Sequence, residues 1–300
     1  MTDSPRQPSS RSPLSMVVRL VAALPLPVAH AVGRMLGRLV YALPGRYRQH
    51  VQQNAAQAGY PGPAFARRAA AETGAMMTEL AHVWFRSADC MEKVICEDWD
   101  VIEQTLAEGR GLVMLTPHLG CFELAARYAA ERISLTIMFR PHRKAVFREL
   151  LDSVRETSNL KAFPATAQGV RAFVRALRQG EAVGLLPDQA PKGDGVWVPF
   201  FGRKAYTITL PCKLASQTGA PLIIAAGERL PHGRGWRMHV KRLTAPMPPT
   251  AEEQAAWINA EVEEMIRRFP EQYLWGYNRY KVPSGTQAPS ANSTETANAA

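Results

Sequence analysis

The middle of the chain alternates short apolar runs with amphipathic stretches. The apolar runs have the length of buried strands: Gly111–Leu115, Ser134–Phe139, Glu181–Leu186 and Pro221–Ala226, with Trp236–Lys241 as a candidate for a fifth. The stretches between them have helical spacing: Cys121–Arg132, Lys144–Ser158, Gln168–Gln179 and Thr207–Thr218. Alternation of strands and helices predicts an α/β fold, with a largely parallel sheet flanked by helices.

Helical patterns lie on both sides of this region. Ala64–Arg86 is a long amphipathic stretch, and Pro61-Gly62-Pro63 marks its start. Ala251–Arg268 is a second one, with Trp257, Ile258 and Val262 on its inward side. We therefore expect one α/β domain over residues 51–283.

The segment before this domain has the pattern of a membrane anchor. Residues 1–13 are rich in Pro, Ser and Arg and are expected to be disordered. Residues 14–50 follow, and their longest run without Arg, Leu20–Gly33, contains two prolines. This run is shorter than the ~20 apolar residues that a straight membrane span requires.

Ala29–Leu43 reads instead as an amphipathic helix. Val32, Met35, Leu36, Leu39 and Val40 form its apolar stripe, and Arg34 and Arg38 lie four residues apart beside it. Such a helix suits the interface of an anionic membrane leaflet. A pair of core-packing helices and a tilted span from Leu14 are the alternatives. Residues 284–300 are small, polar and unpatterned, and we expect a disordered tail there.

Composition narrows the choice of partners. The formal net charge is +10, which favours an anionic partner such as nucleic acid, an anionic membrane or an acidic protein. The chain has no basic run of five or more residues and no zinc-finger spacing, so nucleic acid is the least favoured. Four scattered cysteines, none in a C-x-x-C pair, indicate reduced thiols rather than a disulfide framework.

His118 and Glu123 stand out between a predicted strand and a predicted helix, in the stretch LTPHLGCFE of residues 115–123. In open α/β sheets, ligands bind where strands end. Positions five apart on one helix point about 140° apart, so the two side chains meet only if His118 lies in the loop. A carboxylate behind an imidazole fixes its tautomer and stabilises the imidazolium, which makes a general base.

The motif has other interpretations when it is taken alone. His118 could be a structural histidine with satisfied hydrogen bonds. Cys121 could be a nucleophile, since a thiol at a helix N-terminus has a lowered pKa, although packing is the favoured interpretation for it.

Further motifs extend the pattern along the chain. In order they are Phe139-Arg140-Pro141; Leu186-Pro187-Asp188-Gln189; Val198-Pro199-Phe200-Phe201-Gly202-Arg203; Thr207 and Thr209; Thr218-Gly219-Ala220-Pro221-Leu222-Ile223; and Pro270-Glu271-Gln272-Tyr273-Leu274-Trp275 with Asn278, Arg279 and Lys281. With the H-x4-E stretch, this series resembles the bacterial lipid A biosynthesis acyltransferases, the lauroyl/myristoyl group of the glycerolipid acyltransferase superfamily. The resemblance covers residues 15–283.

The resemblance implies an acyltransferase of the bacterial inner membrane, working on its cytoplasmic face. Its His118 and Glu123 would activate a hydroxyl of a lipid A precursor in late acylation, and the oxygen would attack the thioester of an acyl carrier protein. It implies no acyl-enzyme, no cofactor and no metal. Arg140 would bind phosphate or developing negative charge, Asp188 would be a second acidic contact, and Arg203 and Arg279 would bind head-group phosphates.

Several alternatives stay open at this point. The acceptor could be another membrane glycolipid or an amino-acid-linked lipid. The chain could be a catalytically silent protein that binds lipid or acyl carrier, or a hydrolase in which water replaces the alcohol. Arg171, Arg175 and Arg178 share one helix face, which is either solvated or a dock for acidic carrier protein or head groups. The sequence leaves acyl chain length, acceptor position, coenzyme A as donor and oligomeric state undetermined.

Overall fold

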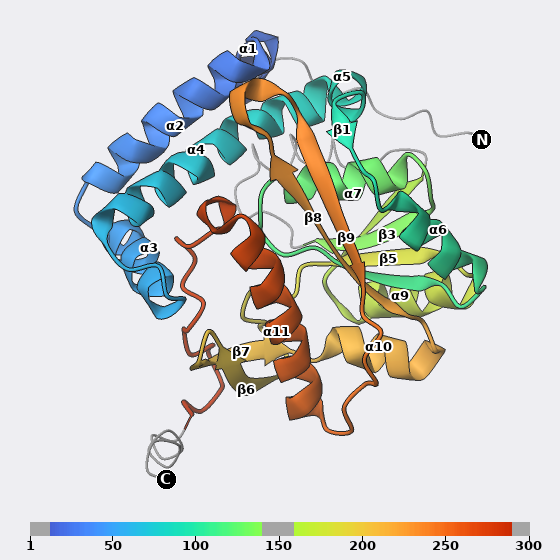
Figure 1. The fold of residues 1–300 in the computed structure, drawn as a ribbon. Helices are drawn as coiled ribbons and strands as arrows, with labels where there is room; N and C mark the ends of the chain where they lie inside the picture. The colour runs from blue at the N-terminus through green and yellow to red at the C-terminus, as the bar shows by residue number, and fades with distance from the viewer. Residues whose placement is uncertain (1–12, 140–158, 290–300) are drawn as a thin grey trace.

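A twisted sheet of seven strands forms the centre of the protein in a computed structural model, which describes residues 13–139 and 159–289 (Figure 1). The strands lie in the order β1-β9-β8-β2-β5-β3-β4. Their bounds are β1 Val94–Ile95, β2 Leu112–Leu115, β3 Leu135–Phe139, β4 Leu160–Pro164, β5 Ala182–Leu185, β8 Leu222–Arg229 and β9 Trp236–Arg242. Neighbouring strands pair in parallel except β8 and β9, which are antiparallel. The predicted fold class, a largely parallel sheet flanked by helices, is confirmed.

Helices cover both faces because successive strand residues point to opposite sides. Leu112 and Met114 of β2 pack into a core with α6 (Trp99–Ala107) and α7 (Phe122–Ala130). Val113 and Leu115 of the same strand pack into the other core. That second core is closed by α9 (Ala167–Arg178), α10 (Leu210–Thr218) and α11 (Ala251–Arg268).

The N-terminal helices form a separate layer at one end of the sheet. They are α1 (Pro13–Ala23), α2 (Leu26–Ala42), α3 (Arg46–Gln57) and α4 (Pro63–Phe85), followed by the short α5 (Ser87–Met91). Figure 1 shows α1 and α2 running alongside α4. The α2–α4 contact is close because a Cβ at Gly33, Gly37 or Gly74 would overlap backbone atoms of the facing helix. Among the described residues, no helix has both the length and the apolar character to cross a bilayer.

An antiparallel hairpin, β6 (Gly195–Phe200) and β7 (Arg203–Ile208), packs against α11. This hairpin and the edge strands β1 and β4 were not predicted from the sequence. The predicted helix start at Thr207 is wrong, because Thr207 belongs to β7 and α10 begins at Leu210. The predicted helix Lys144–Ser158 lies outside the described residues. Short 3-10 turns η1 (Pro231–Gly233) and η2 (Pro270–Gln272) complete the fold.

Two of the terminal segments predicted from the sequence lie at least partly within the described residues. Residues 14–50 are helical as expected and fold against α4. In the predicted tail, the carbonyl of Gln287 accepts a hydrogen bond of 2.9 Å from Trp197 Nε1. Residues 1–12 and 290–300 lie outside the described part of the chain.

Candidate active site

Two loops of the same design meet at the carboxyl edge of the sheet. β2 and β5 are parallel neighbours, and Leu115 and Leu185 are register partners. Each leucine is followed by one residue and a proline, and then by a polar residue, His118 in one loop and Asp188 in the other. Thr116 N donates to Leu185 O at 3.1 Å, which keeps the two chains paired into the loops. Because each polar residue stands three positions beyond its leucine, and the two leucines are register partners, His118 and Asp188 lie side by side.

Asp188 is the carboxylate that holds His118. Its Oδ1 lies 2.9 Å from His118 Nδ1, and its Oδ2 accepts from the His118 main-chain N–H at 3.1 Å. The Asp188 side chain is 1% exposed, whereas that of His118 is 17% exposed. With its proton on Nδ1, the imidazole turns Nε2 outward, where the side-chain amide of Gln189 lies at 3.1 Å. Nε2 is therefore the nitrogen that accepts from Gln189 and that can take a proton once the amide moves away.

The electrostatics of the pair favour an ionised Asp188. Burial opposes ionisation, but the charge of His118 and the hydrogen bonds from its ring and main chain outweigh it and lower the carboxyl pKa below its ordinary value. The same buried carboxylate, after the larger effect of burial itself, raises the pKa of the nearby Tyr273 phenol. Asp188 thus stays an anion behind the imidazole, which is the arrangement of a histidine general base.

The contact expected between Glu123 and His118 is not present. Glu123 Oε1 accepts from Trp84 Nε1 at 3.2 Å and lies 3.5 Å from Arg127 Nε, one turn further along α7. Glu123 is in the first turn of that helix as predicted, with its side chain 30% exposed. Asp188 supplies the carboxylate that bonds the His118 ring, so the predicted pairing of His118 with Glu123 is corrected.

The three predicted arginine contacts have different outcomes. Arg140 lies outside the described residues. Arg203 is exposed at the start of β7, with its guanidinium over the Tyr280 ring at 4.6 Å. Arg279 is 2% exposed and donates to Tyr206 O at 2.7 Å and to Thr207 Oγ1 at 2.8 Å. These bonds hold β7, and the buried guanidinium therefore has a structural place in this geometry, with its Nε unpartnered among the described residues.

Cys121 is fully buried, and burial raises the pKa of its thiol well above the ordinary value. This favours the packing interpretation over the nucleophile. Within the described residues, no cluster of three or more His, Cys, Asp or Glu side chains is arranged to hold a metal ion.

The C-terminal segment after α11 supports the His118 loop from the outside. Leu274 N donates to His118 O at 3.1 Å, and Gly120 N donates to Gln272 O at 3.0 Å. The Gln272 side chain is in turn held by Arg229 at the end of β8, whose main-chain N–H and C=O it bonds at 2.8 and 3.0 Å. Gln272 therefore joins the sheet to the loop that carries the histidine.

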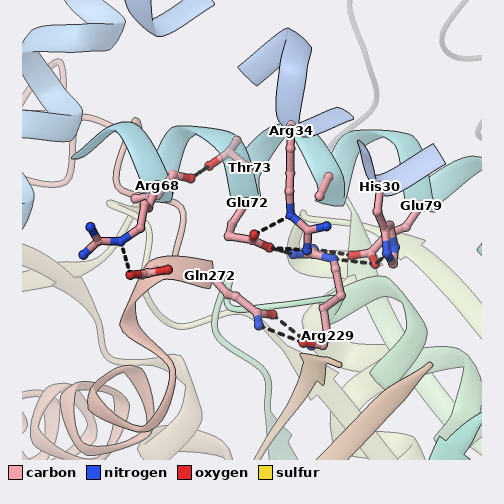
Figure 2. Close-up of polar contacts among 12 residues, drawn as sticks. His30, Arg34, Arg68, Glu72, Thr73, Glu79, Arg229 and Gln272 are labelled. Atoms are coloured by element: carbon pink, nitrogen blue, oxygen red, sulfur yellow. Dashed lines mark hydrogen bonds and ion pairs between the residues drawn. The ribbon is translucent and has the colours of Figure 1, made fainter. Parts of the chain in front are cut away.

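Behind Gln272 lies a buried ionic network that reaches the N-terminal helices (Figure 2). The Arg229 guanidinium donates to Glu79 at 2.5 and 2.8 Å and to Glu72 at 2.7 Å, both on α4. On the α2 side, His30 Nε2 lies 3.1 Å from Glu79, and Arg34 donates to Glu72 at 2.6 Å. Arg34, expected beside the membrane-facing stripe, points inward instead.

Burial opposes ionisation of Glu79, but the charge of Arg229 and the hydrogen bonds from His30 and Arg229 lower its pKa to about 2. Burial lowers the pKa of His30, despite the hydrogen bond to Glu79. A buried ion pair is costly to break because the remaining charge loses its partner. The network therefore fixes α2, α4 and β8 in one arrangement.

A cavity of about 640 Å³ opens at the same edge of the sheet as His118. Its lining includes Met138 of β3, Pro191 three residues beyond Asp188, and Val170 and Thr209 near the starts of α9 and α10. Its size is typical of ligand sites. A second cavity of about 640 Å³ lies over the ionic network, but its arginines, Arg34 and Arg229, are already paired with carboxylates.

Comparison with known proteins decides the family. Residues 13–282 match the family described as bacterial lipid A biosynthesis acyltransferase. The chain belongs to that family. This acyltransferase is 29% identical to the lipid A biosynthesis lauroyltransferase of Escherichia coli K12, over 90% of each chain. It is 26% identical to the lipid A biosynthesis palmitoleoyltransferase of the same organism, over 70% of this chain and 69% of that one.

A more distant similarity extends to another lipid enzyme. The phosphatidylinositol mannoside acyltransferase of Mycobacterium tuberculosis (strain CDC 1551 / Oshkosh) is 28% identical over 47% of this acyltransferase and 45% of its own chain. The resemblance found from the sequence motifs is thereby confirmed for the family and the enzyme class.

The sequence carries a signal for the His118–Asp188 pair that was not predicted from the motifs. Leu115-Thr116-Pro117-His118 and Leu185-Leu186-Pro187-Asp188 share the order Leu, any residue, Pro, polar residue. Both follow apolar runs predicted as parallel strands. Strands adjacent in a sheet would place these two polar residues side by side, but the sequence does not state which strands are adjacent.

Proposed function

We propose that the protein transfers a fatty acyl group from an acyl carrier protein thioester to a hydroxyl of a lipid A precursor, in late lipid A acylation. The family and the names of its lipid A relatives support the acceptor. The observation that carries the chemistry is the His118–Asp188 pair, with the anionic carboxylate on Nδ1 and Nε2 turned outward at the carboxyl edge of the sheet.

In this reaction His118 Nε2 takes the proton of the acceptor hydroxyl as its oxygen attacks the thioester carbonyl carbon. The carbon–sulfur bond then breaks, and the imidazolium returns the proton to the departing thiolate. Asp188 stabilises the imidazolium between these steps. Gln189, which lies on Nε2 at 3.1 Å, gives way to the acceptor. The new ester forms directly, with no acyl-enzyme, no cofactor and no metal.

Glu123 also acts in this reaction, but it contacts the acceptor instead of His118. In the first turn of α7 it is held by Trp84 and Arg127 and is part-exposed. A carboxylate at that place suits a hydrogen bond to the sugar hydroxyls of the acceptor. Arg140 and Arg203 remain proposed contacts for its phosphates.

We place the enzyme on the cytoplasmic face of the bacterial inner membrane, attached by α1 and α2. Large apolar side chains are exposed at twelve described positions, and nine of these lie within residues 16–43: Met16, Val17, Leu20, Val28, Met35, Leu36, Leu39, Val40 and Leu43. A concentration of this kind marks an interaction surface. Exposed Arg19, Arg38 and Arg46 stand in the same segment and suit anionic lipid head groups. This supports interfacial attachment of residues 14–50.

The test is acyl transfer by the purified protein in detergent, with lauroyl- or myristoyl-loaded acyl carrier protein and a tetra-acylated lipid A precursor. Mass spectrometry should show a gain of one acyl group, absent with His118→Ala. Release of free fatty acid as fast as transfer would favour a hydrolase. Carrier binding with neither transfer nor thioester loss would favour a silent binding protein.

A different glycolipid acceptor is the second candidate, favoured by the similarity to a phosphatidylinositol mannoside acyltransferase. Parallel reactions with a mannosylated phosphatidylinositol would distinguish the two. Transfer to that lipid but not to the lipid A precursor would keep the chemistry and replace the acceptor.

A further inference from the structure

The exposed face of α9 carries three arginines that have no acidic partner within the part of the chain that the structure describes. Arg171, Arg175 and Arg178 are exposed, while Phe173 and Leu177 of the same helix are buried in the core. No carboxylate among the described residues forms an ion pair with them, whereas the exposed Lys161 is paired with Glu181. Unpaired surface cations in a row attract an anionic partner.

A groove on this face lies next to the cavity near the active site. It lies between α9 and Gln217 of α10, and its walls include the three arginines with Val170 and Val174. Val170 also lines the 640 Å³ cavity at the carboxyl edge of the sheet. The groove and the cavity therefore adjoin at Val170.

The cavity itself has groups suited to a phosphate. Lys192 and Lys213 line it, with Asp194 3.5 Å from Lys213. Thr209, the residue before α10, also lines it, is only 6% exposed, and has a buried hydroxyl without a hydrogen-bond partner in the described part of the chain. The positive end of α10 favours an anion at this place, although Pro211 in its first turn offers no N–H.

The basic face lies away from the apolar surface of α1 and α2. Figure 1 shows α1 and α2 along one side of the molecule and α9 beyond the sheet on the other side. Among the described elements α9 packs mainly on β3, β4, β5 and α10, and α2 packs mainly on α4. A flat membrane against α1 and α2 would leave the three arginines facing water, so a soluble anionic protein fits them better than lipid.

We propose that this face of α9 is the docking surface for the acidic acyl carrier protein. This inference rests on the proposed function. The carrier's arm, joined to it by a phosphodiester, lies along the groove and enters the cavity. Lys192, Lys213 and Thr209 bind the phosphodiester, and the thioester at the end of the arm is presented toward His118.

The experiment measures binding, so it does not depend on turnover. Fluorescently labelled holo carrier protein is titrated with the full-length protein in detergent, and its anisotropy is followed. The variant R171E/R175E is compared with R67E/R268E, which makes the same charge change at exposed arginines on α4 and α11. We expect the Kd to rise at least tenfold for the first variant and less than twofold for the control. Equal affinities in the two variants would overturn the dock.

Two further measurements separate the remaining possibilities. Both variants are pelleted with vesicles of phosphatidylethanolamine and phosphatidylglycerol, and a selective loss for R171E/R175E would assign the arginines to the membrane instead. The Kd values of apo carrier, which lacks the arm, and holo carrier are then compared for wild type and Thr209→Val. Wild type should prefer holo carrier and the variant should lose that preference; no preference in wild type would overturn the route of the arm. If carrier binds as expected but no acyl group moves, the proposed function fails and the dock stands.

Discussion

His118 and Asp188 lie 70 positions apart in the chain, yet each stands three residues beyond a leucine of the same register pair, and their side chains meet at 2.9 Å. The sheet therefore sets the distance between base and carboxylate. Side chains placed by adjacent central strands are held more firmly than side chains placed by a single mobile loop.

The two acidic residues near His118 should differ in their effect on turnover. Asp188→Asn keeps the shape but removes the charge that stabilises the imidazolium, so kcat should fall about 10²–10⁴-fold, as for loss of a general base. Glu123→Gln should mainly raise KM for the lipid acceptor, since Glu123 does not contact His118. Steady-state kinetics on both variants would check this. A larger kcat loss for Glu123→Gln than for Asp188→Asn would contradict the assignment.

Gln272 should act as a positioning residue. Gln272→Ala removes both side-chain bonds to Arg229 and loosens the segment that bonds His118 O and Gly120 N. We expect kcat to fall about 10–100-fold, because a small misplacement of a catalytic group is costly, with an unchanged far-ultraviolet circular dichroism spectrum. Gln104→Ala, at an exposed glutamine of α6, is the matched control. Equal kcat values for the two variants would rule out this role.

The exposed stripe of α2 should govern membrane attachment. Met35→Gln with Leu39→Gln removes apolar surface from side chains that are 52% and 56% exposed, so the fold should be retained. Vesicle pelleting should drop by roughly tenfold or more, because burying such side chains contributes about 1.5–3 kcal/mol each. Ile95→Gln with Val282→Gln, at exposed sites outside α1 and α2, is the control. Retained pelleting of the α2 variant would refute interfacial attachment through this helix.

Stability should decrease in two stages as the pH falls. His30 faces Glu79, Arg229 and Arg34, and burial lowers its pKa below 6.5, so the unfolded chain takes up its proton first and stability begins to fall below about pH 6.5. The pKa values of Glu72, Glu79 and Asp188 are lowered too, that of Glu79 to about 2, so their contribution is lost as the pH falls below about 4.5. Thermal melts of wild type and His30→Gln should differ in slope between pH 6.5 and 5, where the variant should be flatter. Parallel slopes would exclude His30 as the source of the first stage.

The helices and strands that could be predicted are those whose residue pattern lies within one continuous segment. Ala251–Arg268 was predicted with its observed bounds from its apolar inward positions. In the structure Thr250 and Glu253 form a capping box at its start. The buried strands followed from apolar runs that face helices on both sides. The hairpin was missed because Pro199 interrupts its first strand and its turn places Phe201, a residue unusual there, at a φ of 48°.

What the sequence by itself determined is the α/β class, the family motifs and His118 as the candidate base. Only the tertiary structure decided which carboxylate stands behind it, because that choice depends on β2 and β5 being neighbours in register. The same holds for Arg34 and Arg279, which sequence patterns placed at the surface or on a ligand. Their long side chains reach carboxylates and carbonyls contributed by distant segments, and burial makes those internal bonds costly to leave unmade.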